Sequence, residues 1–187
     1  EMENPSLCVV AVSNPAPKKI GNIALLPDIA FLRNNAPMTK EEVRAVILSK
    51  LQLQPDSIVW DIGAGTGSVS ISCAKCCPYG TVYAIEYQAS ALEILRKNCT
   101  YLQAENVTIL AGRAEQVMAT LPVPDCIFIG GSDGACSSIL QQIQSLPKTV
   151  RLVVSSVTLE TQAELMTLLQ DMPQLEIVQI AVGRSRA

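Results

Sequence analysis

"VWDIGAGTGSVSI", residues 59–71, starts with an apolar run and continues into three glycines at alternate positions, Gly63, Gly65 and Gly67. A glycine-rich turn from strand to helix lets a ligand approach the backbone, and the helix N-terminus offers free N–H groups. The order is not the dinucleotide pattern G-x-G-x-x-G, because the third glycine comes one place early and Ser68 follows it. The Gly-Lys-Ser/Thr ending of a phosphate-binding loop is also missing. The stretch therefore predicts either a different ligand or a tight turn that binds nothing.

Apolar runs rich in Val and Ile alternate with segments of helical spacing on both sides of this turn. The predicted strands are 58–62, 81–85, 107–110, 126–129, 152–155 and 175–182. The predicted helices are 68–77, 90–102, 114–120, 135–145 and 159–169, preceded by one in "MTKEEVRAVILSKLQL" with Thr39 and Glu42 as a capping box. This alternation predicts an α/β fold with a doubly wound, mainly parallel sheet of Rossmann-like type.

Composition limits the partners of the chain. The 187 residues are 49% hydrophobic, which suits one domain with a sizeable core. The stretch "NPAPKK", residues 14–19, has the composition of a linker. We therefore expect residues 1–19 to form a linker or the tail of an upstream domain, and residues 20–187 to form the ligand-binding domain. A net charge of −3 and 4% aromatic residues argue against nucleic acid. No apolar run reaches the ~20 residues of a membrane span. An odd number of cysteines, mostly in apolar segments, is typical of reduced thiols, so we expect a cytoplasmic protein.

The seven cysteines and the absence of histidine restrict the chemistry. Most cysteines lie in apolar segments, which favours reduced core thiols. Cys73-x-x-Cys76-Cys77 offers a redox pair or a metal site as alternatives, but no second ligand pair accompanies it, so we expect no bound metal. Without histidine, catalysis must depend on carboxylates, hydroxyls, lysine, backbone amides or a cofactor.

Glu86 ends the second predicted strand, 19 residues after Gly67. At this spacing a doubly wound fold places a carboxylate that accepts hydrogen bonds from two ribose hydroxyls, the alternative being a solvated surface glutamate. With Asp61 before the glycine turn, the pattern resembles a class I S-adenosylmethionine-dependent methyltransferase. That resemblance implies S-adenosylmethionine as cofactor and S-adenosylhomocysteine as product.

The resemblance also implies a set of cofactor contacts. Asp61 and the glycine-turn backbone would hold the methionine end, and Glu86 the ribose. Many members have an acidic residue where this chain has Arg113, so the Ala114 N–H is the expected adenine contact. The full set of expected cofactor residues is Thr39, Asp61, Gly63, Ala64, Gly65, Thr66, Gly67, Glu86, Arg113, Ala114 and Gly130.

Three longer stretches resemble a narrower family. They are residues 26–71, "IFIGGSDG" at 127–134 and "LVVSSVTLETQAEL" at 152–165, and they resemble the precorrin C15-methyltransferase (decarboxylating) family of cobalamin biosynthesis. Such enzymes methylate C15 of a tetrapyrrole and release carbon dioxide from the acetate at C12. The resemblance implies Thr39, Lys40 and Glu160 as catalytic candidates and Gly131, Ser132 and Thr158 as substrate contacts. Lys40 and Glu160 read equally well as first-turn helix residues.

The family resemblance also suggests partners. Residues 4–15 resemble the tail of an upstream C5-methyltransferase domain, although 7–12 could instead be an edge strand of this domain. Members of the methyltransferase class end in a strand pair, and residues 183–187 are too few to complete it after 175–182. An open sheet edge favours a homo-oligomer, and the family suggests a tetramer. The alternatives are an RNA or other small-molecule methyltransferase and a non-catalytic cofactor-binding module.

Overall fold

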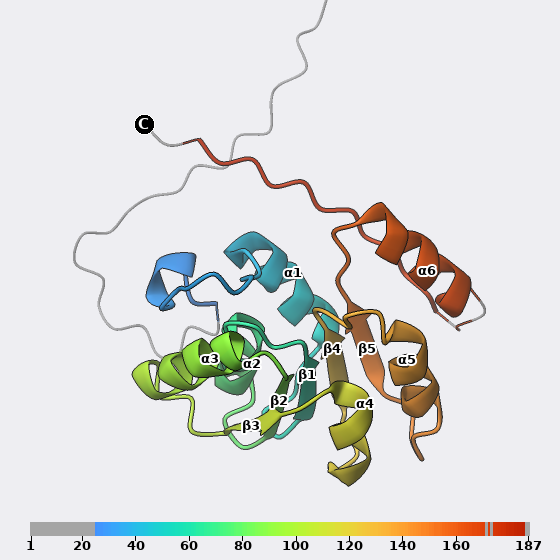
Figure 1. Ribbon diagram of the computed structural model, residues 1–187, viewed down its shortest axis with the longest axis horizontal. Coiled ribbons are helices and arrows are strands. Elements are labelled where there is room, and N and C mark those ends of the chain that lie inside the picture. Colours follow the sequence, from blue (N-terminus) through green and yellow to red (C-terminus); the bar gives the residue numbers. More distant parts are fainter. Residues whose placement is uncertain (1–24, 171, 173, 186–187) are drawn as a thin grey trace, which may run out of the picture.

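The computed structural model describes residues 25–170, 172 and 174–185 of the chain. A five-stranded parallel sheet with the order β3-β2-β1-β4-β5 forms its centre (Figure 1). The strands are β1 (Ile58–Ile62), β2 (Thr81–Glu86), β3 (Val107–Ala111), β4 (Cys126–Ile129) and β5 (Arg151–Val154). The predicted doubly wound α/β fold is confirmed. Its strand order reverses between β1 and β4, and ligands of such sheets bind beyond the carboxyl ends of the strands at this point.

Helices cover both faces of the sheet. They are η1 (Asp28–Ala30), α1 (Glu41–Leu51), α2 (Ser68–Cys76), α3 (Ala89–Tyr101), α4 (Ala114–Val117), η2 (Met118–Thr120), α5 (Cys136–Gln144) and α6 (Leu159–Leu169). Figure 1 shows α1, α2 and α3 on one side and α4, α5 and α6 on the other. All six predicted helices are present, with ends shifted by a few residues. None of the helices in the described ranges is long and apolar enough to cross a membrane.

Alternate residues of β1 supply two hydrophobic cores. Val59 packs with Leu51 and Ile71 under α1 and α2, whereas Trp60 packs with Ile139 under α5. Successive strand residues point to opposite faces, and both faces of a parallel sheet are covered, so this strand is apolar without alternation. The two cores hold the carboxyl end of β1 and its glycine turn in place.

The predicted capping box of α1 is wrong. The helix begins at Glu41, its N-cap is Lys40, and no side-chain cap bond forms there within the described part of the chain. Glu42 instead accepts two hydrogen bonds from Arg184, at 2.7 and 2.6 Å. Charge-assisted bonds of this kind are about twice as strong as neutral ones, so the arginine outcompetes the local cap. Thr39 therefore precedes the helix rather than capping it.

The predicted strand at 175–182 is also wrong. Residues 174–185 run as an extended segment from α6 past α1, without strand pairing among the described residues (Figure 1). Ion pairs Lys50–Glu176 and Arg184–Asp28 fasten it. A strand needs a hydrogen-bonded neighbour, and β5 pairs only with β4 in the described ranges. Self-association through the edge of β5 stays a prediction. The predicted linker at residues 1–19 and the predicted domain boundary at residue 20 lie outside the described residues.

The cysteines form no disulfide among the described residues. The six that the structure describes are free thiols, and Cys73, Cys77, Cys126 and Cys136 are buried. Burial raises the pKa of Cys77 to about 12, so it stays protonated and is a poor nucleophile. The described ranges contain no group of three or more side chains that could hold a metal ion. The thiols thus serve as core residues, and Cys8 lies outside the described residues.

Candidate active site

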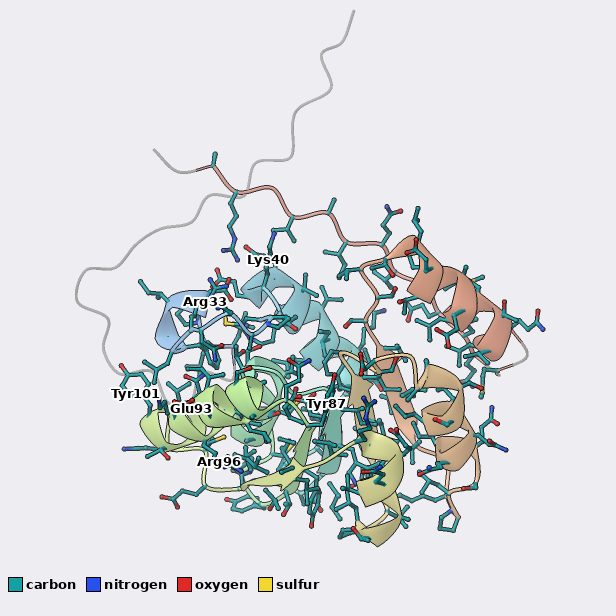
Figure 2. All side chains as sticks on the ribbon, viewed as in Figure 1. Arg33, Lys40, Tyr87, Glu93, Arg96 and Tyr101 are labelled. Atoms are coloured by element: carbon teal, nitrogen blue, oxygen red, sulfur yellow. The ribbon has the colours of Figure 1, made fainter. Side chains whose placement is uncertain are left out.

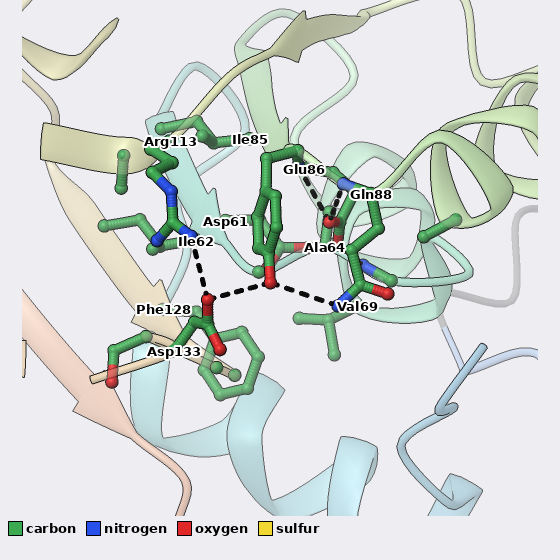
Figure 3. Close-up of a pocket in the computed structure, with 18 of the residues that line it drawn as sticks. Asp61, Ile62, Ala64, Val69, Ile85, Glu86, Gln88, Arg113, Phe128 and Asp133 are labelled. Carbon is green, nitrogen blue, oxygen red and sulfur yellow. Dashed lines mark hydrogen bonds and ion pairs between the residues drawn. The ribbon is translucent and has the colours of Figure 1, made fainter. Parts of the chain in front are cut away.

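A cavity of about 280 Å³ opens at the carboxyl ends of β1, β2 and β4 (Figure 3). Its walls come from the turn after β1, the residues that follow β2 and β3, and the β4–α5 loop. The predicted site residues that it brings together are Thr39, Asp61, Gly63, Ala64, Gly65, Glu86, Arg113, Ala114, Gly130, Gly131 and Ser132. The remaining ones, Lys40, Thr66, Gly67, Thr158 and Glu160, lie outside its walls.

Asp61 is completely buried at the carboxyl end of β1. Ser70 Oγ donates a hydrogen bond to Asp61 Oδ2, while Oδ1 has no partner among the described residues. Burial raises the pKa of Asp61 to about 6, opposed by the hydrogen bonds from Ser70 and reinforced by the charge of Glu86. An unpaired buried oxygen costs free energy unless a ligand satisfies it. Because Asp61 lines the cavity, the position suits a positively charged donor.

Glu86 ends β2 and is only 7% exposed, which excludes a solvated surface glutamate. Its Oε2 accepts a hydrogen bond from the Gly65 N–H at 2.9 Å. Its Oε1 accepts from the N–H groups of Tyr87 and Gln88, at 2.8 and 2.9 Å. These bonds leave roughly one of about four acceptor positions free. The carboxylate therefore shapes the glycine turn and can still receive a hydroxyl.

The glycine turn is held by the neighbouring strand. The N–H groups of Gly63 and Ala64 both donate to the carbonyl of Ile85, at 3.0 Å each. Thr66 is buried behind the turn, and Gly67 is the N-cap of α2. Gly63, Ala64 and Gly65 thus face the cavity. Thr66 and Gly67 lead into α2.

Three side chains from different loops meet at the cavity mouth. Asp133 Oδ2 accepts a hydrogen bond from Tyr87 Oη at 2.9 Å and forms an ion pair with Arg113 at 3.2 Å (Figure 3). The Arg113 guanidinium lies 4.7 Å from the centre of the Tyr87 ring. Ala114, the residue after Arg113, also lines the cavity. Arg113 is therefore engaged at the rim, which leaves the backbone of Ala114 as the expected adenine contact.

A second, larger groove of about 1380 Å³ runs between α1, β5 and the segment 174–182. Pro37, Thr39 and Gly130 line both this groove and the first cavity, so the two join at these residues. Lys40 lies in the wall of the groove at the start of α1 (Figure 2). The walls are mainly apolar and include Val43 of α1 and Val154 of β5.

The two candidates after β5 lie away from the cavity. Thr158 is the N-cap of α6, because its Oγ1 accepts from the Thr161 N–H at 3.2 Å. Glu160 is exposed in the first turn of the same helix, where a carboxylate favours the helix dipole. Both residues therefore have a structural role at the start of α6. Substrate contact by Thr158 and a catalytic role for Glu160 stay predictions.

Several site residues were missed by the sequence reasoning. Tyr87 directly follows Glu86, so the strand-end position could have indicated it. Ser70 lies two residues into α2 and reveals its role only through contact with Asp61. Asp133 follows two glycines in "IGGSDG", and its sequence context does not indicate that its carboxylate meets Tyr87 and Arg113. Contacts between loops such as these cannot be recognised from the sequence alone.

Residues 30–187 match the family model described as precorrin methyltransferase domain. A Salmonella typhimurium protein named cobalt-precorrin-6B C(15)-methyltransferase (decarboxylating) is 44% identical over 116 residues, 62% of this chain and 59% of that protein. The solved structure of precorrin-6y C5,15-methyltransferase from Geobacter metallireducens has a TM-score of 0.75 and 38% identity, covering 79% of each chain.

A further solved structure is the C-terminal domain of precorrin-6Y C5,15-methyltransferase from Rhodobacter capsulatus. It has a TM-score of 0.70 and 29% identity, covering 90% of this chain and 92% of that one. The family resemblance inferred from the sequence is confirmed, and it outweighs the RNA methyltransferase alternative. The matched region includes the glycine turn, Asp61, Glu86 and both cavities. The chain belongs to the precorrin methyltransferase domain family.

Proposed function

We propose that this chain transfers a methyl group from S-adenosylmethionine to C15 of a precorrin-6-type tetrapyrrole and removes the C12 acetate carboxyl as carbon dioxide, a step of cobalamin biosynthesis. Family membership and the names of its relatives support this reaction. The structural observation that carries it is the buried Oδ1 of Asp61, which has no partner among the described residues and lies in the wall of the same cavity as Glu86 on the neighbouring strand β2.

The residues of the cavity fit the methyl donor. Asp61 Oδ1 is the acceptor for the ammonium group of the methionine end, and the remaining acceptor position of Glu86 receives a ribose hydroxyl. The backbone of Gly63 and Gly65 allows the ligand to lie against the turn, and Ala114 supplies an N–H for adenine. When bound, S-adenosylmethionine supplies a methyl group on a positively charged sulfur.

The larger groove is the proposed site of the tetrapyrrole. It meets the cofactor cavity at Pro37, Thr39 and Gly130, so the acceptor carbon and the methyl group would meet there. Its apolar walls suit the macrocycle, and Lys40 can pair with an acidic side chain of the substrate. An electron-rich carbon of the macrocycle attacks the methyl directly, so the protein mainly aligns two reactants. This agrees with a chain that has no histidine.

One assay tests the proposal. The protein is incubated with S-adenosylmethionine labelled in its methyl group and a precorrin-6-type substrate. Label should appear in the tetrapyrrole together with an equimolar release of carbon dioxide. Binding of S-adenosylhomocysteine without turnover would instead indicate a non-catalytic module, and methylation without carbon dioxide would contradict the decarboxylating reaction.

Replacing Glu86 tests the cofactor site. Glu86→Ala should weaken calorimetric binding of S-adenosylhomocysteine by about 1.5–3 kcal/mol, because hydrogen bonds to a charged group contribute this much. The matched control is Glu93→Ala, since Glu93 is exposed on α3 in an ion pair with Lys97 (Figure 2). A folded Glu86→Ala protein with unchanged affinity would disprove the ribose assignment.

The domain is also proposed to work beside an upstream C5-methyltransferase domain, as the bifunctional names of two solved relatives suggest. β5 pairs with β4 alone in the described part of the chain, and this open edge supports a homo-oligomer, for which we propose a tetramer. Sedimentation at several concentrations would test the assembly, and a monomer at all of them would refute it.

A further inference from the structure

Arg44 is completely buried on α1, although arginine is rarely found inside a protein without a partner. Its Nη1 donates to the Thr39 carbonyl at 2.6 Å and its Nη2 to the Leu26 carbonyl at 2.5 Å. Nη1 also faces Asp28 Oδ1 at 3.3 Å, and the guanidinium lies 4.9 Å from the centre of the Phe31 ring. All four partners belong to residues 26–39, which we call the roof segment.

The hydrogen bonds of Arg44 join the two ends of the roof segment. Leu26 and Thr39 are its first and last residues, so a single side chain fixes both to α1. Asn98 of α3 holds the middle, with Leu32 N–H donating to its Oδ1 at 2.7 Å. The Nδ2 of Asn98 donates to the carbonyl of Thr66 in the glycine turn, at 2.9 Å. The roof segment is thereby attached to both flanking helices.

The fixed end of the roof segment covers the glycine turn. Pro37 and Thr39 line the cofactor cavity and the groove, where the two join. The Pro37 carbonyl is so close to Gly65 that a Cβ on this glycine would lie 2.9 Å from the oxygen. A displacement of the roof segment would therefore alter the passage between methyl donor and acceptor.

Burying a charge requires compensation. Replacing a whole buried ion pair by well-packed apolar residues is often neutral or stabilising, so the buried charge alone is weak evidence for a role in stability. What an apolar residue cannot do is donate in two directions from one rigid plane. The planar guanidinium group donates from both of its terminal nitrogens, so it can hold two backbone carbonyls at a fixed distance from each other.

We propose that Arg44 is a positioning residue for methyl transfer, which acts by holding Pro37 and Thr39 over the junction of the two cavities. The inference rests on the proposed function. Arg44 contacts neither the cofactor site nor the groove directly, because it lies behind the roof segment. Its effect on the reaction passes through the Thr39 carbonyl and the Leu26 carbonyl.

Three variants test this role. Arg44→Met keeps the length and loses the donors, Arg44→Lys keeps the charge but not the fork, and Arg96→Met is the control at an exposed position on α3 (Figure 2). Amide hydrogen exchange of the ligand-free protein should be faster by about tenfold or more in residues 26–39 of Arg44→Met, because at least two charge-assisted bonds are lost. Exchange in the sheet and in Arg96→Met should match the wild type.

Kinetics complete the test. In Arg44→Met, kcat at saturating S-adenosylmethionine and precorrin-6-type substrate should fall about tenfold to 100-fold, as misplacement of reactants by about 1 Å would cause. Arg44→Lys should lie between. A purely structural role would lower the unfolding midpoint and leave kcat of the folded fraction unchanged, which would overturn the proposal.

Two further outcomes also bear on the role of Arg44. If Arg44→Met does not fold, Arg44→Lys takes its place, because it keeps the charge but loses the fork that reaches both carbonyls, and unchanged exchange in residues 26–39 of Arg44→Lys would overturn the proposal. If the wild type does not bind S-adenosylhomocysteine, the proposed function fails, and the role in methyl transfer fails with it. Amide hydrogen exchange in the ligand-free protein measures how firmly Arg44 holds the roof segment, whether or not the protein transfers a methyl group.

Discussion

Lowering the pH from 7 to 5 should weaken the binding of S-adenosylhomocysteine about tenfold, because the carboxyl group of Asp61 takes up a proton near pH 6. The unpaired Oδ1 accepts a charge-assisted hydrogen bond from an ammonium group only when the carboxyl is ionised. The ammonium keeps its proton throughout this range. The affinity, measured by calorimetry at several pH values, should fall along a curve centred near pH 6.

The stability of the ligand-free protein should respond in the opposite direction. Burial raises the pKa of Asp61 from 3.8 to about 6, so between these values the folded state binds more protons than the unfolded chain. The contribution of Asp61 to the free energy of unfolding therefore increases as the pH falls through this range. Asp61→Asn should remove both pH dependences. An affinity that does not change between pH 7 and pH 5 in the wild type would contradict the assignment of Asp61.

Glu42 does not obscure this measurement. Its bonds with Arg184 lower the pKa of Glu42 from 4.5 to about 2. A carboxyl with a lowered pKa contributes stability that is present above pH 4.5 and lost as the pH falls towards 2. The range from pH 5 to 7 lies above this window, so the signal there belongs to the buried carboxyl.

The centre of the site could be predicted because its determinants are local. Asp61, the glycine turn and Glu86 lie on two consecutive strands, and a parallel crossover fixes where their carboxyl ends meet. The spacing of 19 residues between Gly67 and Glu86 therefore carries three-dimensional information. The same argument located Gly130 and Ser132 at the end of β4.

What the sequence could not provide are contacts between distant segments. Arg184 lies 142 residues from Glu42 and takes the carboxylate that the capping box needed. Residues 175–182 have strand character, yet strand formation depends on a neighbour rather than on side-chain propensity. Arg44 reads as one polar residue on an amphipathic helix, and only the fold shows that it is buried against the roof segment.

The two cavities explain why the reaction needs few chemical groups. In the proposed function, methyl donor and acceptor occupy different cavities, which join at Pro37, Thr39 and Gly130. Two of these residues offer only backbone and apolar atoms to the junction, so their contribution is placement and the exclusion of water. Rate enhancement by alignment is the mechanism that such a site can provide.

Gly63→Ala should lower the free energy of unfolding by about 2–5 kcal/mol and abolish cofactor binding. The φ angle of Gly63 is +74°, a conformation that costs an alanine about 1–2 kcal/mol. A Cβ there would also lie 2.5 Å from the Gly131 carbonyl oxygen and 2.8 Å from its nitrogen. Both partners are backbone atoms, so the β4–α5 loop must shift, at a further cost of about 1–3 kcal/mol.

Gly134→Ala is the control that separates backbone strain from collision. Gly134 has a similar φ of +80°, but a Cβ there would meet nothing within 4 Å. Urea unfolding should therefore show a loss of only about 1–2 kcal/mol for Gly134→Ala, and the excess loss in Gly63→Ala measures the contact with Gly131. Equal losses in the two variants would show that the loop yields without cost. In that case the turn after β1 and the β4–α5 loop are not packed rigidly against each other, and the floor of the cofactor cavity is not preformed.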